Sequence, residues 1–217
     1  MENLNPYYPV FLDLRGRRVV VVGGGLVAAR KIDGLLKSAC HIKVIAPDIR
    51  PELASLPLEF VRRDYAAGDL NGASLAFAAT DDAELNALIA RDAAAAGILC
   101  NAASAPETGD FIVPALFERG PIKIAISTGG ASPALAKRLR FELGCQIGRE
   151  YEQLALILNR IRPLVLAQPG GSAAHQRVFE LLVGSELIEA LHAGELAEAE
   201  AIVAMVLGES LDLGDIL

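Results

Sequence analysis

The chain has 217 residues, of which 53% are hydrophobic, and it carries a formal net charge of −7 at pH 7. Its length suffices for one or two globular domains, and its acidic balance excludes general nucleic-acid binding, which requires a basic surface. Its apolar stretches are too short for a membrane helix and its first residues lack the pattern of a secretion signal, so we expect a cytoplasmic protein without a membrane span.

The first predicted element is a valine-rich strand that ends in three glycines. Residues 19–22 are all valine, and glycines occupy positions 23–25. Gly23, Gly25 and Ala28 fit the G-x-G-x-x-G/A fingerprint, in which the missing Cβ atoms allow a tight turn and let a pyrophosphate approach the backbone. A helix-period pattern follows, so the phosphates are expected at a helix start, where unpaired N–H groups favour an anion.

An acidic residue follows the second predicted strand, which spans residues 42–46. Asp48 can accept hydrogen bonds from the ribose hydroxyls of adenosine, which favours NAD over NADP as the cofactor. The alternative reading is a tight strand-to-helix turn without a ligand and with Asp48 solvated. The candidate cofactor-binding residues are Gly23, Gly25, Leu26, Val27, Pro47, Asp48 and Thr80.

Strands and helices continue to alternate up to about residue 101. Strands are expected at residues 58–62, 74–78 and 98–101, and a helix with an acidic first turn is expected at residues 83–95. This alternation predicts an α/β fold, a Rossmann-like doubly wound parallel sheet. Ligands in such sheets bind beyond the carboxyl ends of the strands.

The pattern changes near Pro114. Residues 111–113 and 122–127 are strand-like, and Ser132 followed by Pro133 is typical of a helix start. Helical stripes continue from Gly148 to the end of the chain. The sequence therefore predicts a small α+β module and an all-helical C-terminal domain after the parallel sheet, with boundaries at 1–113, 114–147 and 148–217.

A set of segments carries a resemblance to one family of enzymes: residues 9–14, 22–31, 78–82, 111–114 and 125–136, together with Asn101. In these segments the chain resembles the siroheme-synthesis proteins that oxidise precorrin-2 with NAD. These are the precorrin-2 dehydrogenase/sirohydrochlorin ferrochelatase proteins and the N-terminal half of siroheme synthase. Since no methyltransferase half follows, the resemblance is to the stand-alone form.

The resemblance implies an oxidoreductase that converts precorrin-2 to sirohydrochlorin with NAD, with or without subsequent insertion of ferrous iron. It also implies a homodimer held by the module at residues 114–147, with the tetrapyrrole as substrate. The residues it selects for binding the acidic arms of the substrate are Ser127, Thr128, Gly129, Gly130, Ser132, Lys137 and Arg138. From spacing alone, the same segment fits an ordinary capped helix with solvated basic side chains as well as it fits a ligand site.

One position departs from the family. Where relatives commonly have an Asp three residues after Asn101, this chain has Ser104, whose hydroxyl is not a general base at neutral pH without help. Ser104 and Asp110 are the candidate catalytic residues, and the departure weakens the expectation of metal insertion. Asp110 also fits a solvated loop position or a turn cap.

The sequence leaves a second function open. The scattered histidines and cysteines predict no resident metal site, so a metal would enter only as a substrate. A chain with a dinucleotide-binding half and a dimerising second half also fits an NAD-binding regulatory module without catalysis. The segment 127–133 favours the enzyme, because a sensor has no evident need for it.

Overall fold

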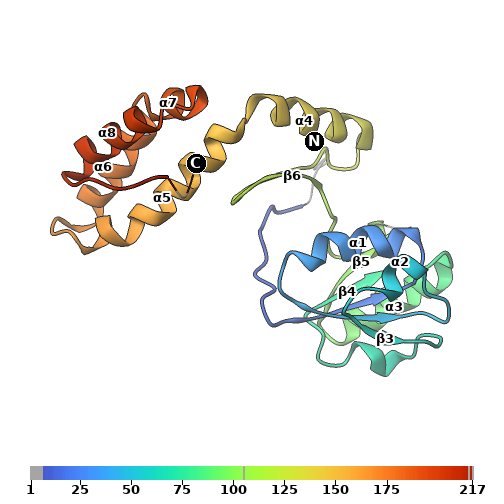
Figure 1. Cartoon of the computed structure of the whole chain (residues 1–217). Helices are drawn as coiled ribbons and strands as arrows, with labels where there is room; N and C mark the ends of the chain where they lie inside the picture. The colour runs from blue at the N-terminus through green and yellow to red at the C-terminus, as the bar shows by residue number, and fades with distance from the viewer. Residues whose placement is uncertain (1–6, 105, 215, 217) are drawn as a thin grey trace, which may run out of the picture. The chain divides into compact units, whose positions relative to one another are not determined.

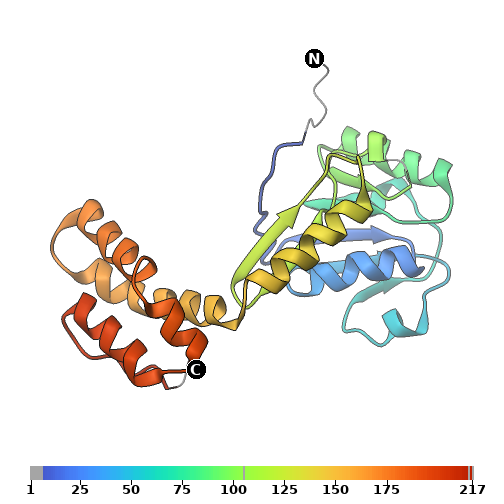
Figure 2. The same cartoon turned by 90° about the horizontal axis from the view of Figure 1, so that it is seen from above.

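The structure, a computed structural model, describes residues 7–104, 106–214 and 216. Contacts within it divide the chain into two units, residues 1–113 and 114–217. Figure 1 and Figure 2 show their elements in chain order. The further separation of residues 114–147 from residues 148–217 stays a prediction.

The first unit is built on a five-stranded parallel sheet in the order β3-β2-β1-β4-β5. Val19, Val20 and Val21 of the central strand have no exposed surface, because both faces of the sheet are covered. The expected doubly wound α/β fold is confirmed. The strands are β1 (Arg18–Val22), β2 (His41–Ile45), β3 (Glu59–Val61), β4 (Leu75–Ala78) and β5 (Leu99–Ala102).

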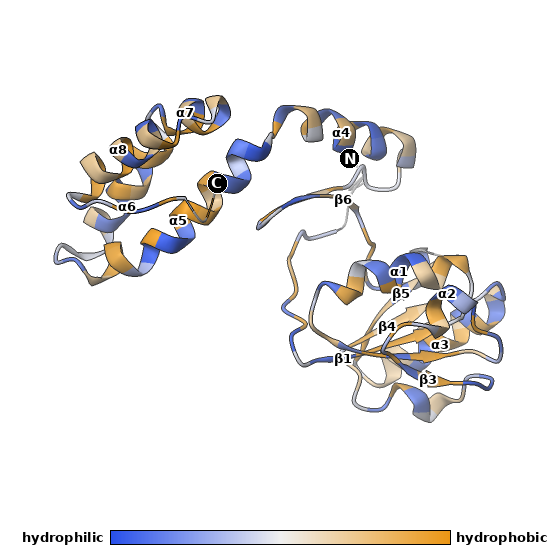
Figure 3. Cartoon of the chain, in the orientation of Figure 1, coloured by the Kyte–Doolittle hydropathy of each residue, from blue (hydrophilic) through white to orange (hydrophobic). Residues whose placement is uncertain are grey.

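Helices cover the two faces of this sheet. On one face, α1 (Leu26–Leu36) and the short α2 (Pro51–Ala54) pack on Val19 and Val21. On the other face, α3 (Ala83–Ala95) and the 3₁₀ turn η1 (Ala67–Leu70) complete a second apolar cluster. Figure 3 shows the hydrophobic strands that lie between them. The sequence predicted α1 and α3 but missed α2 and η1, which are too short to give a periodic signal.

The prediction of a strand at residues 111–113 is wrong. These residues are not in a strand, and the segment lies against the edge of β5 through single contacts. The backbone N–H of Asp110 donates to the carbonyl of Cys100 at 2.8 Å, and Nδ2 of Asn101 donates to the carbonyl of Phe111 at 2.8 Å. The side chain of Asn101 therefore occupies the Phe111 carbonyl that a strand ladder with β5 would use. Pro114, which follows the segment, has no N–H to extend such a ladder.

The second unit begins with a β-hairpin and a helix. Strands β6 (Ala115–Arg119) and β7 (Ile122–Ile126) pair antiparallel, and α4 (Pro133–Gln146) packs against them. A Cβ added at Gly144 would lie 3.2 Å from Cε2 of Phe117, so the glycine permits the close packing of α4 on β6. As predicted, Ser132 caps α4, and its Oγ accepts from the N–H of Leu135 at 3.2 Å.

The rest of the second unit is helical, as expected. Helices α5 (Arg149–Ala167), α6 (Gly171–Val183), α7 (Leu187–Ala193) and α8 (Leu196–Leu207) surround one apolar cluster. Ile157 and Ile161 of α5 are fully buried in it. In the part of the chain that the structure describes, no helix combines the length and the apolar character needed to cross a membrane.

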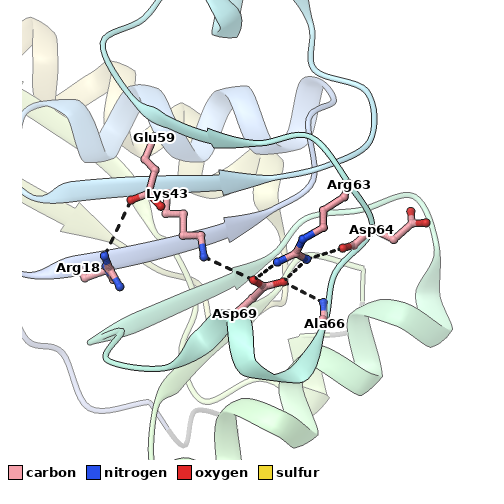
Figure 4. Close-up of polar contacts among 7 residues, drawn as sticks. All are labelled: Arg18, Lys43, Glu59, Arg63, Asp64, Ala66 and Asp69. Carbon is pink, nitrogen blue, oxygen red and sulfur yellow. Dashed lines mark hydrogen bonds and ion pairs between the residues drawn. The ribbon is translucent and has the colours of Figure 1, made fainter.

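A buried carboxylate holds the loop between β3 and η1 in the first unit (Figure 4). Both oxygens of Asp69 accept from the guanidinium of Arg63 at 2.7 Å, and Nζ of Lys43 on β2 lies 3.5 Å from Oδ1. The Asp69 side chain is 5% exposed. The hydrogen bonds from Arg63 lower the pKa of Asp69 from its usual 3.8 to about 2. The pair therefore stabilises the fold above about pH 4, and this stabilisation is lost as the pH falls towards 2.

We expect Asp69→Asn to lower the free energy of unfolding near neutral pH by about 1.5–3 kcal/mol, because hydrogen bonds to a charged partner are lost and Lys43 keeps an uncompensated charge. Denaturant unfolding followed from neutral to acidic pH measures this loss, which should shrink as Asp69 of the wild type becomes protonated. The control is Glu59→Gln, which removes an exposed ion pair with Arg18 at 3.9 Å and should change stability by less than about 0.5 kcal/mol. Equal losses in both variants would contradict the assignment.

Candidate functional site

The carboxyl ends of β1 to β4 border a cavity of about 640 Å³ in the first unit. This is the edge at which parallel α/β sheets bind ligands. The residues that the sequence selected for the cofactor all lie in the lining of this cavity: Gly23, Gly25, Leu26, Val27, Pro47, Asp48 and Thr80. The structure thus brings these residues together, and their individual roles in binding stay predictions.

Two of the three glycines are required by the fold itself. Gly23 has φ +126°, and a Cβ there would collide with the carbonyl of Ala79. A Cβ at Gly24 would collide with the carbonyl oxygen of Asp48, and the carbonyl of Gly24 accepts from the N–H of Arg50 at 3.1 Å. The glycine loop therefore rests on the segments that follow β2 and β4.

Gly25 differs from its two neighbours. Among the described residues, no heavy atom lies within 4 Å of a Cβ built on Gly25, which lines the cavity and is exposed. It is the N-cap of α1, and within the described structure no side chain caps this helix start. Uncapped N–H groups at the positive end of a helix, beside a backbone without a Cβ, are suited to a pyrophosphate. The residues present therefore fit a dinucleotide.

Two apolar side chains in the first turn of α1 are exposed. Val27 is 43% exposed and lines the cavity, as does Leu26, which is 53% exposed. The buried residues of α1 are Ala28, Ile32 and Leu35. Exposed apolar side chains at the mouth of a cavity are typical of ligand contacts.

The far wall of the cavity contains residues that the sequence analysis missed. Asp64 and Tyr65 follow β3 and line the cavity opposite the glycine loop segment, and the hydroxyl of Tyr65 donates to Oδ2 of Asp92 at 3.0 Å. Burial and the neighbouring Asp92 carboxylate raise the pKa of Tyr65. Arg63, held by Asp69, also donates to the carbonyl of Asp64 at 2.8 Å. The signal in the sequence that could have indicated Asp64 and Tyr65 is their position after a strand of the parallel sheet.

The candidate catalytic residue Ser104 follows β5, outside the described lining of the cavity. It is exposed, and its Oγ accepts a hydrogen bond from Nδ2 of Asn86 at 2.8 Å. The same Asn86 side chain bonds to the backbone of Thr80, which lines the cavity. One buried side chain therefore connects Ser104 to the cavity edge.

The second candidate catalytic residue, Asp110, is engaged in the fold. Its Oδ2 accepts from the N–H of Cys100 on β5 at 2.8 Å, while its own N–H donates to the carbonyl of Cys100. Burial raises the pKa of the Cys100 thiol to about 11. One carboxylate oxygen of Asp110 thus closes the edge of the sheet, and a catalytic role for this residue stays a prediction.

The candidate substrate-binding residues belong to the second unit. The loop between β7 and α4 has positive φ at Gly129 (+61°) and Gly130 (+87°). Several hydroxyls in it are used within the loop: Oγ of Ser127 accepts from the N–H of Gly129, and Oγ1 of Thr128 bonds to both the N–H and the carbonyl of Ser132, all at 3.1 Å. These bonds give the loop a defined shape, and its use in binding stays a prediction.

The basic side chains after this loop lie on the surface of α4. Lys137 and Arg138 are exposed, and Nε of Arg138 donates to Oε1 of Glu142 at 2.7 Å. Arg138 is therefore partly neutralised in the isolated chain. Over the described residues, no group of three or more histidine, cysteine or acidic side chains is placed to hold a metal ion.

Two sequence families match the chain in the expected order. The family described as "Putative NAD(P)-binding" matches residues 10–115, and the family described as "Sirohaem biosynthesis protein central" matches residues 119–144. The siroheme synthase of Chromobacterium violaceum is 39% identical over 199 residues, or 90% of this chain, and that of Stutzerimonas stutzeri is 36% identical over 202 residues, or 91%. The chain is thus similar to sirohaem biosynthesis proteins over most of its length. The resemblance stated from the sequence motifs is confirmed.

The chain spans less than half of those two siroheme synthases, 42% and 43% of their lengths. Its similarity to a solved structure is more complete. The structure titled "SirC, precorrin-2 dehydrogenase" aligns with 92% of this chain and 98% of its own, at 29% identity and a TM-score of 0.77. The parallel sheet, the small antiparallel pair and the C-terminal helices thus match the fold of that solved structure.

We expect Gly25→Ala to weaken NAD binding by about tenfold, or ~1.4 kcal/mol, without lowering thermal stability, because the new Cβ fills only the space where a pyrophosphate would lie. Calorimetric titration with NAD and thermal unfolding measure the two effects. The matched variant is Gly24→Ala, whose Cβ meets backbone and should lower the melting temperature. An unchanged NAD affinity in folded Gly25→Ala would remove this helix start from the site.

Proposed function

We propose that this protein oxidises precorrin-2 to sirohydrochlorin with NAD in siroheme biosynthesis. The main support for this proposal is that the glycine loop, the uncapped start of α1 and Asp48 line the same cavity. The match of residues 119–144 to a sirohaem biosynthesis family model and the likeness to a precorrin-2 dehydrogenase over 92% of the chain support it. A cytoplasmic location, expected from the sequence, stays a prediction.

Within this proposal, residues of the cavity contact two parts of the cofactor. The backbone at Gly25 and the first N–H groups of α1 hold the pyrophosphate, and the exposed carboxylate of Asp48 accepts from the adenosine ribose hydroxyls and repels a 2′-phosphate. We therefore propose NAD and not NADP. NAD bound there would supply the acceptor for the hydride that leaves a carbon of the substrate together with the loss of one proton. The contribution of the chain is to orient the two reactants and exclude water.

For the substrate, we propose that the loop between β7 and α4 and the basic start of α4 bind its acetate and propionate arms. Lys137 and Arg138 are exposed cations that can donate charge-assisted hydrogen bonds to carboxylates. Because Arg138 already pairs with Glu142, a carboxylate arm has to compete with that bond. The hydroxyls of Ser127 and Thr128 and the N–H groups near Gly129 and Gly130 complete this proposed surface.

The proposal also includes the insertion of ferrous iron as a second substrate. It requires the loss of two protons from pyrrole nitrogens, and relatives commonly have a carboxylate where this chain has Ser104. Asp110 is the nearest acidic candidate by sequence, but one of its oxygens already accepts from Cys100. We therefore expect oxidation to be the main activity and iron insertion to be slow.

The test is an anaerobic assay of the purified chain with precorrin-2 and NAD, followed by absorbance. We expect sirohydrochlorin and NADH to appear in equal amounts, with NADP much less effective. Adding ferrous iron then measures metal insertion, which Ser104→Asp should raise by restoring a proton acceptor. NAD binding without oxidation would contradict the proposal and support the regulatory module instead.

We also propose that the chain acts as a homodimer held by β6, β7 and α4. Along α4, Leu135 is 48% exposed and Phe141 is 71% exposed, while the described residues of this helix bury only Ala136. Leu116 on β6 adds to the same apolar surface. Apolar side chains gathered on a helix and the adjacent hairpin are typical of a surface that another protein covers.

We expect Phe141→Asp to shift the protein from dimer to monomer in sedimentation velocity, because a carboxylate would be buried in the proposed interface without a partner. Circular dichroism checks that the helices remain folded. Met205→Asp is the matched control, since Met205 is 79% exposed on α8 and should not affect association. A monomeric wild type at micromolar concentration would refute the proposal of a stable dimer.

A further inference from the structure

One buried amide joins the ends of two neighbouring strands at the edge of the cavity. Strands β4 and β5 run parallel, so Thr80 and Ser104, which follow them, lie at the same edge of the sheet. Asn86, in the first turns of α3, has no exposed surface and lies between them. Neither the sequence motif nor the proposed function assigns a role to this asparagine.

All four hydrogen-bonding positions of the Asn86 amide are occupied. Its Oδ1 accepts from the N–H of Thr80 at 3.1 Å and from Oγ1 of Thr80 at 2.8 Å. Its Nδ2 donates to the carbonyl of Thr80 at 3.0 Å and to Oγ of Ser104 at 2.8 Å. A backbone N–H can only donate and a carbonyl can only accept, so the orientation of the amide is fixed by Thr80.

This orientation of the amide determines that the Ser104 hydroxyl oxygen accepts a hydrogen bond from Asn86. Because Nδ2 of Asn86 can only donate, Oγ of Ser104 must accept, and its own hydrogen is directed to another group. Ser104 is exposed, so that hydrogen is available to a bound molecule. The complementary ligand chemistry is an oxygen acceptor, either a carboxylate arm of the substrate or the carboxamide oxygen of a nicotinamide.

We propose that Asn86 is a positioning residue that fixes Ser104 as a hydrogen-bond donor to a carboxylate or carboxamide oxygen of a bound reactant. The inference rests on the proposed function for the identity of the reactants. Continuity with the cavity supports it, because the Thr80 peptide held by Asn86 is the one against which Gly23 packs: a Cβ on Gly23 would lie 3.2 Å from the nitrogen of Thr80. An Asp at position 104 would accept the same hydrogen from Asn86 but would have none to donate.

A series at position 104 separates donation from packing. Ser104→Thr keeps the hydroxyl and should keep the KM of both reactants closer to the wild-type values than Ser104→Ala does. Ser104→Ala loses the donor, and Ser104→Asp keeps the bond from Asn86 but presents a negative oxygen. We expect the KM of one reactant to rise about tenfold in the alanine variant and further in the aspartate variant, with little change in melting temperature. The reactant whose KM rises, NAD or precorrin-2, identifies the acceptor.

A double-mutant cycle tests the role of Asn86. Asn86→Ala should raise the same KM as Ser104→Ala, and in the Ser104→Ala background it should raise it no further, although it lowers stability in both. Additive effects on KM would show that Asn86 supports only the fold and would overturn the inference. If Asn86→Ala does not fold, equal kinetics of Ser104→Ala and Ser104→Thr would overturn it independently.

Direct binding separates this inference from the proposed function. Calorimetry with NAD and, anaerobically, with sirohydrochlorin gives dissociation constants that do not depend on turnover. A wild type that binds these molecules but does not oxidise precorrin-2 would refute the proposed function. In that case, the double-mutant cycle is measured with dissociation constants and still decides the role of Asn86. If the inference holds, Asn86→Ala and Ser104→Ala weaken the binding of the same molecule and their effects do not add.

Discussion

The close approach of the glycine loop to two neighbouring segments is the contact on which the candidate site depends. Gly24 lies against the carbonyl of Asp48, and Gly23 lies against the peptide between Ala79 and Thr80. Any side chain at either position would push the loop away from the ends of β2 and β4. The same loop leaves Gly25 and the start of α1 open. Steric exclusion at two glycines thus shapes the cavity, and the absence of a side chain at the third leaves room for a ligand.

Two buried polar groups hold the rest of the cavity edge. Asp69 fixes the loop that carries Asp64 and Tyr65, and Asn86 fixes the turn at Thr80 and the start of the loop at Ser104. Each is almost completely buried and well satisfied by hydrogen bonds, which is the condition under which buried polar groups rigidify a site. The walls are therefore preorganised before any ligand binds, which lowers the entropic cost of binding.

The loss of a carboxylate at position 104 changes what this edge can do chemically. A serine held by an amide donor presents a hydrogen, whereas an aspartate would present a proton acceptor. Hydride transfer to a nicotinamide depends above all on the orientation of the reactants, so it tolerates this exchange. Metal insertion requires proton acceptors and tolerates it poorly. Under the proposed function, oxidation and iron insertion therefore differ in what they require of this one hydrogen bond.

The sequence by itself determined the alternation of strands and helices, the position of the glycine loop, the position of Asp48 after the second strand and the cap at Ser132. Each of these is a local pattern of burial or backbone conformation. It misplaced the strand near residue 112 and missed α2 and η1, where local signals are short or ambiguous. Only the tertiary structure decided the partners of Asn86, Asp69 and Asp110. Such hydrogen bonds join residues that are separated in the sequence, and their geometry exists only once the chain has folded.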